Sequence, residues 1–358
     1  MNCINDVICF DKRQTNIAKG IAVLLLLWHH VFYNNPNNYE LFSSLMSVNG
    51  IPIESLISDF CKVCVAIFLI LSGYGLCKSY ESFSKSYGRV FKDKSILKAR
   101  FGFAINHLLK LMFSFWFVYL VFVPLSIWFG TPFWNVYNDN ILFGVLDFLG
   151  LSALFGTPTI NSTWWFMGVI IVYYLLFPLL MKLLDYCGEI LVAISACLLF
   201  VPVFYALPNQ LSTWILPFTA GMYFSKNNLF EKCDVRINNV FQKCIFVFLG
   251  IISTALMRYI NAGFDTLFAF AVIIGCYFLL SKMMFINVLL EHLGKYSGAI
   301  FMFHTFIYSY YFKNFIYSFK YAPLIFLIMV LLCYVIAVGL EWLKKLTRYD
   351  KLINRIAR

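Results

Sequence analysis

Charged side chains are scarce in this chain, and acidic ones most of all. Only 13% of its 358 residues are charged, with 17 Asp and Glu against 28 Lys and Arg, whereas a soluble domain carries about 25% charged residues. Hydrophobic residues make up 61% of the sequence and include 40 Phe. A water-soluble globule needs more polar surface to cover that much apolar area, so the composition excludes a soluble domain of any size.

No polar domain separates the apolar blocks. Each block is about 17–25 residues long, which is the length of a helix that crosses a bilayer. We therefore predict an all-α fold, a polytopic membrane helix bundle with about ten transmembrane helices. The first block has no small-residue cleavage site after it, so it predicts a retained helix and not a signal peptide. A short helix over 141–156 should lie in, or dip into, the outer face. The predicted spans are 17–33, 62–79, 104–128, 163–182, 189–206, 211–226, 241–259, 264–281, 296–312 and 322–343.

Lys and Arg are absent from two long segments between the spans, 34–61 and 129–162. Basic residues collect on the cytoplasmic side of membrane proteins, which places 78–100, 226–243 and both termini in the cytoplasm. All but four of the 28 basic residues then lie inside. The exceptions are Lys62, Arg258, Lys313 and Lys320. We expect a multi-pass protein of a cell membrane, bacterial in type, with a transmembrane domain over 1–343 and a basic cytoplasmic tail over 344–358.

The residues for a metal or redox site are also lacking. Cys61 and Cys64 form a C-x-x-C pair, but a zinc or redox site would need a second pair or a polar setting. Most of the 11 cysteines lie in apolar blocks, where a free thiol is a small hydrophobe. The net charge of +11 comes from residues between apolar blocks and not from one amphipathic face. We expect no metal, no tightly bound cofactor and no nucleic-acid partner.

Ionisable residues within the spans are functional candidates, because each costs at least about 2.5 kcal/mol to insert. Lys19 and His30 are eleven positions apart, which puts them on one side of a helix and about 16 Å apart along its axis. His29 is turned by about 100° from His30. His304 lies about 13 Å into its span from the inner side, a depth close to that of His30. A snorkelling Lys19, a packed core His304 and a headgroup anchor at Arg100 are the structural alternatives.

The run AKGIAVLLLLWHHVF resembles the first helix of the acyltransferase family 3 membrane proteins. That family is acyl-CoA-dependent, usually has ten spans and modifies bacterial surface glycans. Its hallmark is a basic residue, ten intervening residues and then His, which falls on Lys19 and His30. Lys19 stands where the family usually has Arg. The positive charge is kept, but the planar guanidinium that binds phosphate in a bidentate manner is lost.

Four further stretches resemble parts of the family's sequences, and they occur along this chain in the same order as in the family. Ser72, Gly73 and Tyr74 match an S-G-Y element in FLILSGYGLCKSY, and STWILPFTAGMYFSK matches a short helix with Gly near its inner end. The run GKYSGAIFMFHTFIY matches a late helix that ends in His304. The run STWWFMGVIIVYYLLFPLL matches a middle helix through Trp165, Phe166, Tyr174 and Pro178. Many members carry an additional outer esterase-like domain; only 344–358 follow the last predicted span here, so we expect none.

The resemblance implies transfer of an acyl group, acetyl in type, from cytoplasmic acyl-CoA to a hydroxyl of a cell-surface or lipid-linked glycan. A base must take the hydroxyl proton, and His suits this role because its pKa lies near 7. We assign His30 as the base, with Lys19 and His304 as further catalytic residues. Lys19, Tyr74 and Arg100 are assigned as donor-binding groups. Direct transfer and an acyl-His intermediate both remain open. A transporter or flippase for a glycan or lipid precursor is the alternative, and a sensor or scaffold without chemistry is a third.

Overall fold

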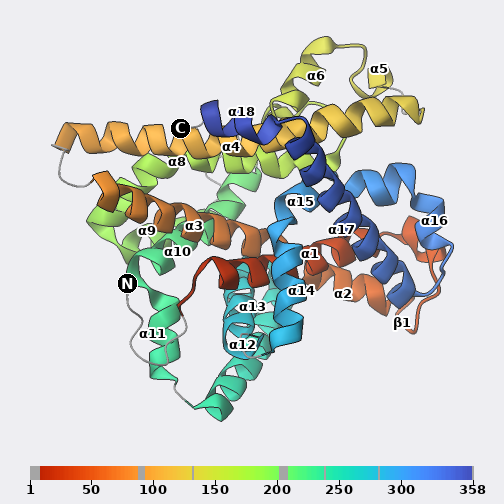
Figure 1. Cartoon of the computed structure of the whole chain (residues 1–358). Coiled ribbons are helices and arrows are strands. Elements are labelled where there is room, and N and C mark those ends of the chain that lie inside the picture. The colour runs from red at the N-terminus through yellow and green to blue at the C-terminus, as the bar shows by residue number, and fades with distance from the viewer. Residues whose placement is uncertain are drawn as a thin grey trace. The chain divides into compact units, whose positions relative to one another are not determined.

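The computed structural model describes residues 9–87, 93–130, 133–200, 209–237, 239–280 and 283–356. These residues are helical apart from loops and one antiparallel sheet, in which β1 (Ser47–Val48) pairs with β2 (Ile51–Pro52). The all-α class is therefore confirmed. The chain divides into two compact units, each described by itself below (Figure 1).

The first unit comprises Met1–Val23, Val63–Arg100 and Phe177–Lys295. It holds the first part of α1 (Lys12–Val31), all of α3 (Cys64–Tyr87), the start of α4 (Asp93–Trp128) and the end of α8 (Trp165–Cys187). Helices α12 and α13 form a hairpin in which Asn261 caps the connecting turn. The remaining elements are α9 (Glu189–Phe200), α10 (Asn209–Asn227), α11 (Leu229–Arg236), α12 (Val240–Ile260), η3 (Ala262–Phe264), α13 (Asp265–Leu279) and α14 (Met284–Lys295).

Small residues allow a close helix crossing in this unit, between α3 and α10. A Cβ built on Gly73 would collide with the Phe218 carbonyl, and one built on Gly221 would collide with the Ile70 carbonyl. Only glycine lets the two backbones approach this closely, as is common in membrane helix packing. The glycine of the S-G-Y element therefore serves helix packing.

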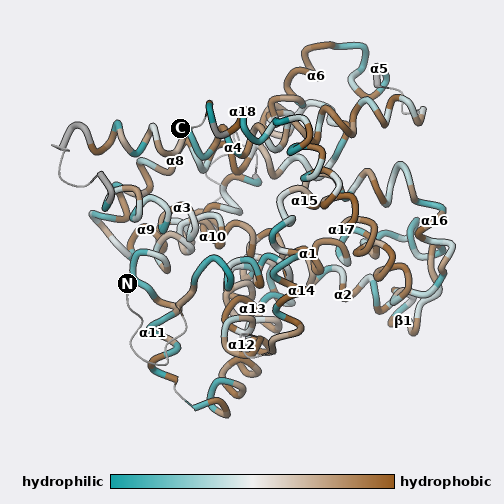
Figure 2. The backbone as a smooth tube through the Cα atoms, in the orientation of Figure 1, coloured by the Kyte–Doolittle hydropathy of each residue, from teal (hydrophilic) through white to brown (hydrophobic). Residues whose placement is uncertain are grey.

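The second unit comprises Leu24–Lys62, Phe101–Leu176 and Tyr296–Arg358. It holds the rest of α1, most of α4 and the first half of α8. Helix α15 continues directly into a π-helical turn, η5, and α17 is largely apolar (Figure 2), with the highest mean hydropathy of the described helices that could cross a membrane. The remaining elements are η1 (Pro36–Leu41), α2 (Ile53–Cys61), α5 (Phe133–Val136), α6 (Ile141–Phe148), α7 (Ser152–Phe155), η2 (Ser162–Trp164), α15 (Ser297–Thr305), η5 (Phe306–Tyr311), α16 (Lys313–Tyr317), α17 (Ala322–Leu346) and α18 (Tyr349–Ile356).

Each predicted span coincides with a helix, but not every such helix is a clear membrane span. Within the described ranges, six helical segments are long and apolar enough to cross a membrane. They are Ile53–Lys85, Ile96–Trp128, Ser162–Cys187, Val240–Ile260, Ala262–Leu279 and Ala322–Leu346. The others are polar at one end, as α1 is, or short, as α9 and α15 are. The count of about ten and the orientation of the termini stay predictions; the end of span 189–206, Arg89, Lys92 and Arg358 lie outside the described residues.

Large apolar side chains stand exposed along α12. Phe241 is 70% exposed, Phe248 64% and Ile260 83%, and only 11% of the apolar window of this helix is buried. A soluble protein rarely leaves such a continuous apolar face uncovered. The exposure is instead what a helix needs when hydrocarbon surrounds it.

The smaller predictions have mixed outcomes. The helix expected over 141–156 is two short helices, α6 and α7, because Gly150 has a positive φ of 70° and breaks the run. Cys61 and Cys64 are both buried. Cys9 is disulfide-bonded and is an exception to the predicted free cysteines.

Candidate functional site

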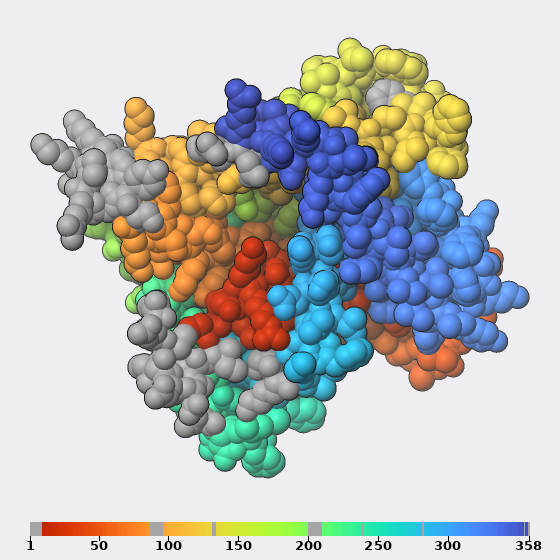
Figure 3. Space-filling view, in the orientation of Figure 1, coloured from red at the N-terminus to blue at the C-terminus, as the bar shows by residue number. Residues whose placement is uncertain are grey.

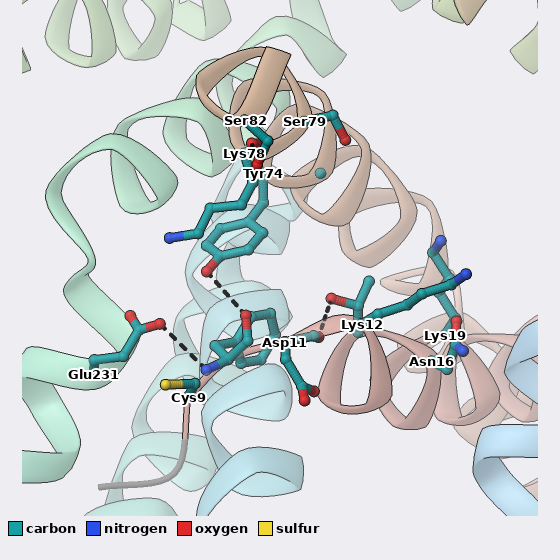
Figure 4. Close-up of a pocket in the computed structure, with 13 residues that line it drawn as sticks. Cys9, Asp11, Lys12, Asn16, Lys19, Tyr74, Lys78, Ser79, Ser82 and Glu231 are labelled. Atoms are coloured by element: carbon teal, nitrogen blue, oxygen red, sulfur yellow. Dashed lines mark hydrogen bonds between the residues drawn. The ribbon is translucent and has the colours of Figure 1, made fainter. Parts of the chain in front are cut away.

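A pocket with a volume of about 670 Å³ opens in the first unit, at the N-terminal end of α1 (Figure 4). Three lysines line it: Lys12 and Lys19 from α1 and Lys78 from α3. Figure 3 shows this end of α1 at the molecular surface beside α14. A half-buried cavity with three cations fits an anionic ligand.

The carboxylates of the pocket are engaged by the backbone. Asp11 caps α1, since its Oδ1 accepts from the amides of Arg13 at 2.8 Å and Gln14 at 3.0 Å. Glu231 accepts from the Phe10 amide at 3.2 Å. Neither lysine of α1 forms an ion pair within the part of the chain that the structure describes. Both are thus available to a ligand's phosphates.

Tyr74 holds the chain that leads into α1. Its hydroxyl donates to the Phe10 carbonyl at 3.1 Å, and its ring meets the Phe10 ring edge-on at 5.0 Å. Phe10 also stacks on Phe230 at 4.1 Å. The structure therefore places the predicted donor-binding Tyr74 in the pocket wall, where its hydroxyl positions the residues that precede Lys12.

Arg100 does not line this pocket. Its Nη2 lies 2.5 Å from Asp185, which also binds Lys226 at 2.6 Å, and its Nε donates to the Tyr80 hydroxyl at 3.3 Å. The guanidinium belongs to an ion-pair cluster of its own in the first unit. A contact between Arg100 and the donor stays a prediction that the geometry does not favour.

The second unit brings two of the predicted histidines together. The ring centroids of His30, on α1, and His304, on α15, are 4.8 Å apart. His29 instead turns to α2, where its Nδ1 lies 2.8 Å from the Ser58 carbonyl. Tyr308 covers both rings of the pair, with centroid distances of 6.1 Å to His30 and 6.3 Å to His304.

The hydrogen bonds of His304 fix the position of its proton. Its Nδ1 lies 3.1 Å from the Ile300 carbonyl and 2.9 Å from the Phe301 carbonyl. A carbonyl only accepts, so Nδ1 must carry the hydrogen and Nε2 the lone pair. His304 is fully buried, and Nε2 has no hydrogen-bond partner among the described residues. A buried acceptor left without a donor costs stability, which marks this atom as a functional candidate.

A second buried polar cluster surrounds Asp147 in the segment before α8. The carboxylate accepts from the Tyr137 hydroxyl at 2.7 Å, the Ser152 hydroxyl at 2.9 Å and the Ile160 amide at 3.0 Å. Burial raises the pKa of the Asp147 carboxyl, although the hydrogen bonds it accepts act in the opposite direction. The cluster holds 137–160 in one conformation.

Sequence reasoning found His30, His304 and Lys19 but missed the groups around them. Tyr308 could have been inferred, because it follows His304 by four residues on a helix and so shares its side. Lys12 and Lys78 were counted only as topology signals, and Glu231 was not considered. Their shared pocket depends on how α1, α3 and α11 pack, and no local pattern encodes that.

A family model described as an acyltransferase domain matches residues 13–342, nearly the whole chain. The match contains α1, with Lys19 and His30, and α15, with His304. No curated protein and no solved structure matches the chain.

Proposed function

The chain belongs to this acyltransferase family, and from that premise we propose that it is a membrane O-acyltransferase. The donor is acyl-CoA, with acetyl as the simplest acyl group, and the acceptor is a hydroxyl of a cell-surface or lipid-linked glycan. The observation that carries the proposal is the pair of His30, which is half-buried, and His304, which is fully buried, lying side by side within one unit. Two imidazoles in an otherwise apolar interior suit proton transfer better than packing.

The pair can serve an acyl transfer in which every atom is accounted for. The glycan hydroxyl oxygen attacks the thioester carbonyl carbon, so a C–O bond forms and the C–S bond breaks. His30 takes the hydroxyl proton as general base, and this proton then neutralises the CoA thiolate. The lone pair on His304 Nε2 gives the proton a second acceptor beside His30.

The lysine-lined pocket supports a phosphate-bearing donor. Lys12, Lys19 and Lys78 offer ammonium groups of the kind that bind phosphate as point charges. The amide end of α1 adds a partial positive charge in the same place. An uncharged donor would gain nothing from such a lining.

Outer segments with aromatic and amide side chains support a sugar acceptor. The 129–162 segment contains Trp134 and Asn135, which are exposed, and no Lys or Arg. A sugar ring has apolar C–H faces for aromatic rings and hydroxyls for amides. Transfer directly to the glycan, without a second protein, is the simplest scheme that these segments allow.

The test is reconstitution of the purified chain in lipid with labelled acetyl-CoA and an extracted lipid-linked glycan, without an ion gradient. Label should appear on the glycan as an ester that mild base releases. Label that reaches the glycan only after a second protein is added would refute direct transfer. Movement of unmodified glycan across the bilayer, with no ester formed, would favour the transporter alternative.

A further inference from the structure

One backbone carbonyl beside His304 accepts two side-chain donors from a distant part of the sequence. The Met302 carbonyl accepts from Asn161 Nδ2 at 3.2 Å and from Trp164 Nε1 at 2.8 Å. Asn161 is 0% exposed, Trp164 2% and Met302 3%. All belong to the second unit. Two buried donors on one helix carbonyl require an explanation, because a carbonyl inside an α-helix normally accepts from the helix itself.

The helix is irregular at this carbonyl. In a regular α-helix the Phe306 amide would donate to Met302, but here it donates to the Phe303 and His304 carbonyls. The next six residues, Phe306–Tyr311, are π-helical, and π-turns inside helices are frequent at functional sites. Asn161 and Trp164 thus satisfy the carbonyl where the helix changes its hydrogen-bond pattern.

The same turn of helix sets the orientation of His304. The Ile300 and Phe301 carbonyls, which fix its Nδ1–H tautomer, precede Met302 directly. Thr305, which follows His304, is tied to the same distant segment, since its hydroxyl lies 3.2 Å from that of Thr163. Contacts from 161–164 therefore brace the chain on both sides of the imidazole.

We propose that Asn161 and Trp164 are positioning residues that hold the α15 turn at Met302 so that His304 Nε2 keeps its lone pair toward His30. The proposal rests on the proposed acyl transfer and deepens it. Neither side chain needs to touch a substrate. Their loss should slow the chemical step and leave donor binding unchanged, because a small misplacement of a catalytic group costs rate more than affinity.

Two conservative variants remove the donors one at a time. Asn161→Asp keeps the oxygen that accepts from the Thr163 amide and hydroxyl but removes the N–H₂ that reaches Met302. Trp164→Phe keeps a ring against Phe115 and Phe306 but removes the indole N–H. Each should lower kcat for acetyl transfer about tenfold, and the double variant about a hundredfold. KM for acetyl-CoA should change less than about twofold.

Matched controls exist in the same unit. Trp116 also donates an indole N–H to a carbonyl, that of Phe148 at 2.9 Å, and Asn140 also caps a helix, by accepting from the Leu142 amide at 3.0 Å. Trp116→Phe and Asn140→Asp should leave kcat within about twofold of the wild type. Equal losses of kcat in the test and control pairs would reduce Asn161 and Trp164 to general stabilisers and overturn the proposal.

A spectroscopic readout separates this proposal from the proposed function. The chain has 5 His, so solid-state NMR on isotope-labelled histidine can identify His304 by the signal lost in His304→Gln. Wild-type His304 should be the Nδ1–H tautomer, and the folded double variant should show a mixture. An Nε2–H tautomer in the wild type, or an unchanged tautomer in the double variant, would overturn the positioning role. If the tautomers are those expected but no acyl transfer is detected, the proposed enzyme activity is refuted and the positioning role is not.

Discussion

His29 and His30 are neighbours in the sequence, yet their side chains have different surroundings. His29 is hydrogen-bonded to the Ser58 carbonyl on α2, whereas His30 faces His304 on α15. The helical rotation of about 100° between consecutive residues produces this difference. The spacing argument that selected His30 from the sequence therefore agrees with the side chains that the fold brings together.

His30→Ala should lower the acyl-transfer rate about 10²- to 10⁴-fold, as expected for loss of a general base. Acyl-CoA binding, measured by titration of the purified protein, should stay within a few-fold of the wild type. His29→Ala removes the hydrogen bond to α2 and a ring contact beside His30 but leaves the proposed base in place, so it should cost activity far less. A dead His29→Ala beside an active His30→Ala would show that the base has been assigned to the wrong residue.

Lys19→Ala should raise KM for acyl-CoA about tenfold, because a hydrogen bond to a charged group contributes about that factor to binding. The effect on kcat should be smaller. Lys19→Arg should retain activity, because the charge persists. Lys85→Ala is the control, since Lys85 is exposed and is not among the residues that line the pocket. Steady-state kinetics over a range of acyl-CoA concentrations measures all three. Equal KM values would leave Lys19 as a topology anchor only.

At the scale of elements, the segment from Tyr137 to Ile160 depends on the buried Asp147 carboxylate. Because burial raises its pKa above the ordinary value of 3.8, the folded state keeps its proton to higher pH than the unfolded state. The contribution to stability is therefore fully present below pH 3.8 and is lost as pH rises through the folded pKa. The wild type should therefore lose stability through this group as pH rises, whereas Asp147→Asn should not.

Thermal unfolding of both proteins in the same detergent, from pH 4 upward, measures the effect. The Tm difference should shift in favour of Asp147→Asn as pH rises, even though Asn is the weaker acceptor for Tyr137 and Ser152. A Tm difference that is constant across this range would contradict the raised pKa. Asp139→Asn is a suitable control, because Asp139 is exposed in the same segment.

The elements also show how far sequence reasoning reaches. Apolar length located the helices, because a span must be a continuous run, and helical spacing put His30 and Lys19 on one side of α1. The π-turn after His304 and the two donors on Met302 were not predictable, since they join residues about 140 positions apart through tertiary packing. Gly73 was identified as part of the S-G-Y element, but its close approach to the α10 backbone appears only in the fold.

At the scale of the whole molecule, charge decides which side of the membrane each loop occupies. The 78–100 segment carries Lys78, Lys85, Arg89, Lys92, Lys94, Lys98 and Arg100, and the 34–61 segment carries no basic residue. Anionic lipids on the cytoplasmic face attract each Lys or Arg by about 1 kcal/mol. Seven such residues in 78–100, against none in 34–61, favour the cytoplasmic side for the 78–100 segment.

We therefore expect an impermeant thiol reagent to label Leu45→Cys in intact cells, and Lys85→Cys only after the cells are opened, both in a Cys-free background. Leu45 is 78% exposed and Lys85 is exposed as well, so burial would not protect either position. The opposite pattern would place the N-terminal end of α1 outside. Lys12 and Lys19 would then open to a compartment without acyl-CoA, and the donor assignment would fail together with the orientation.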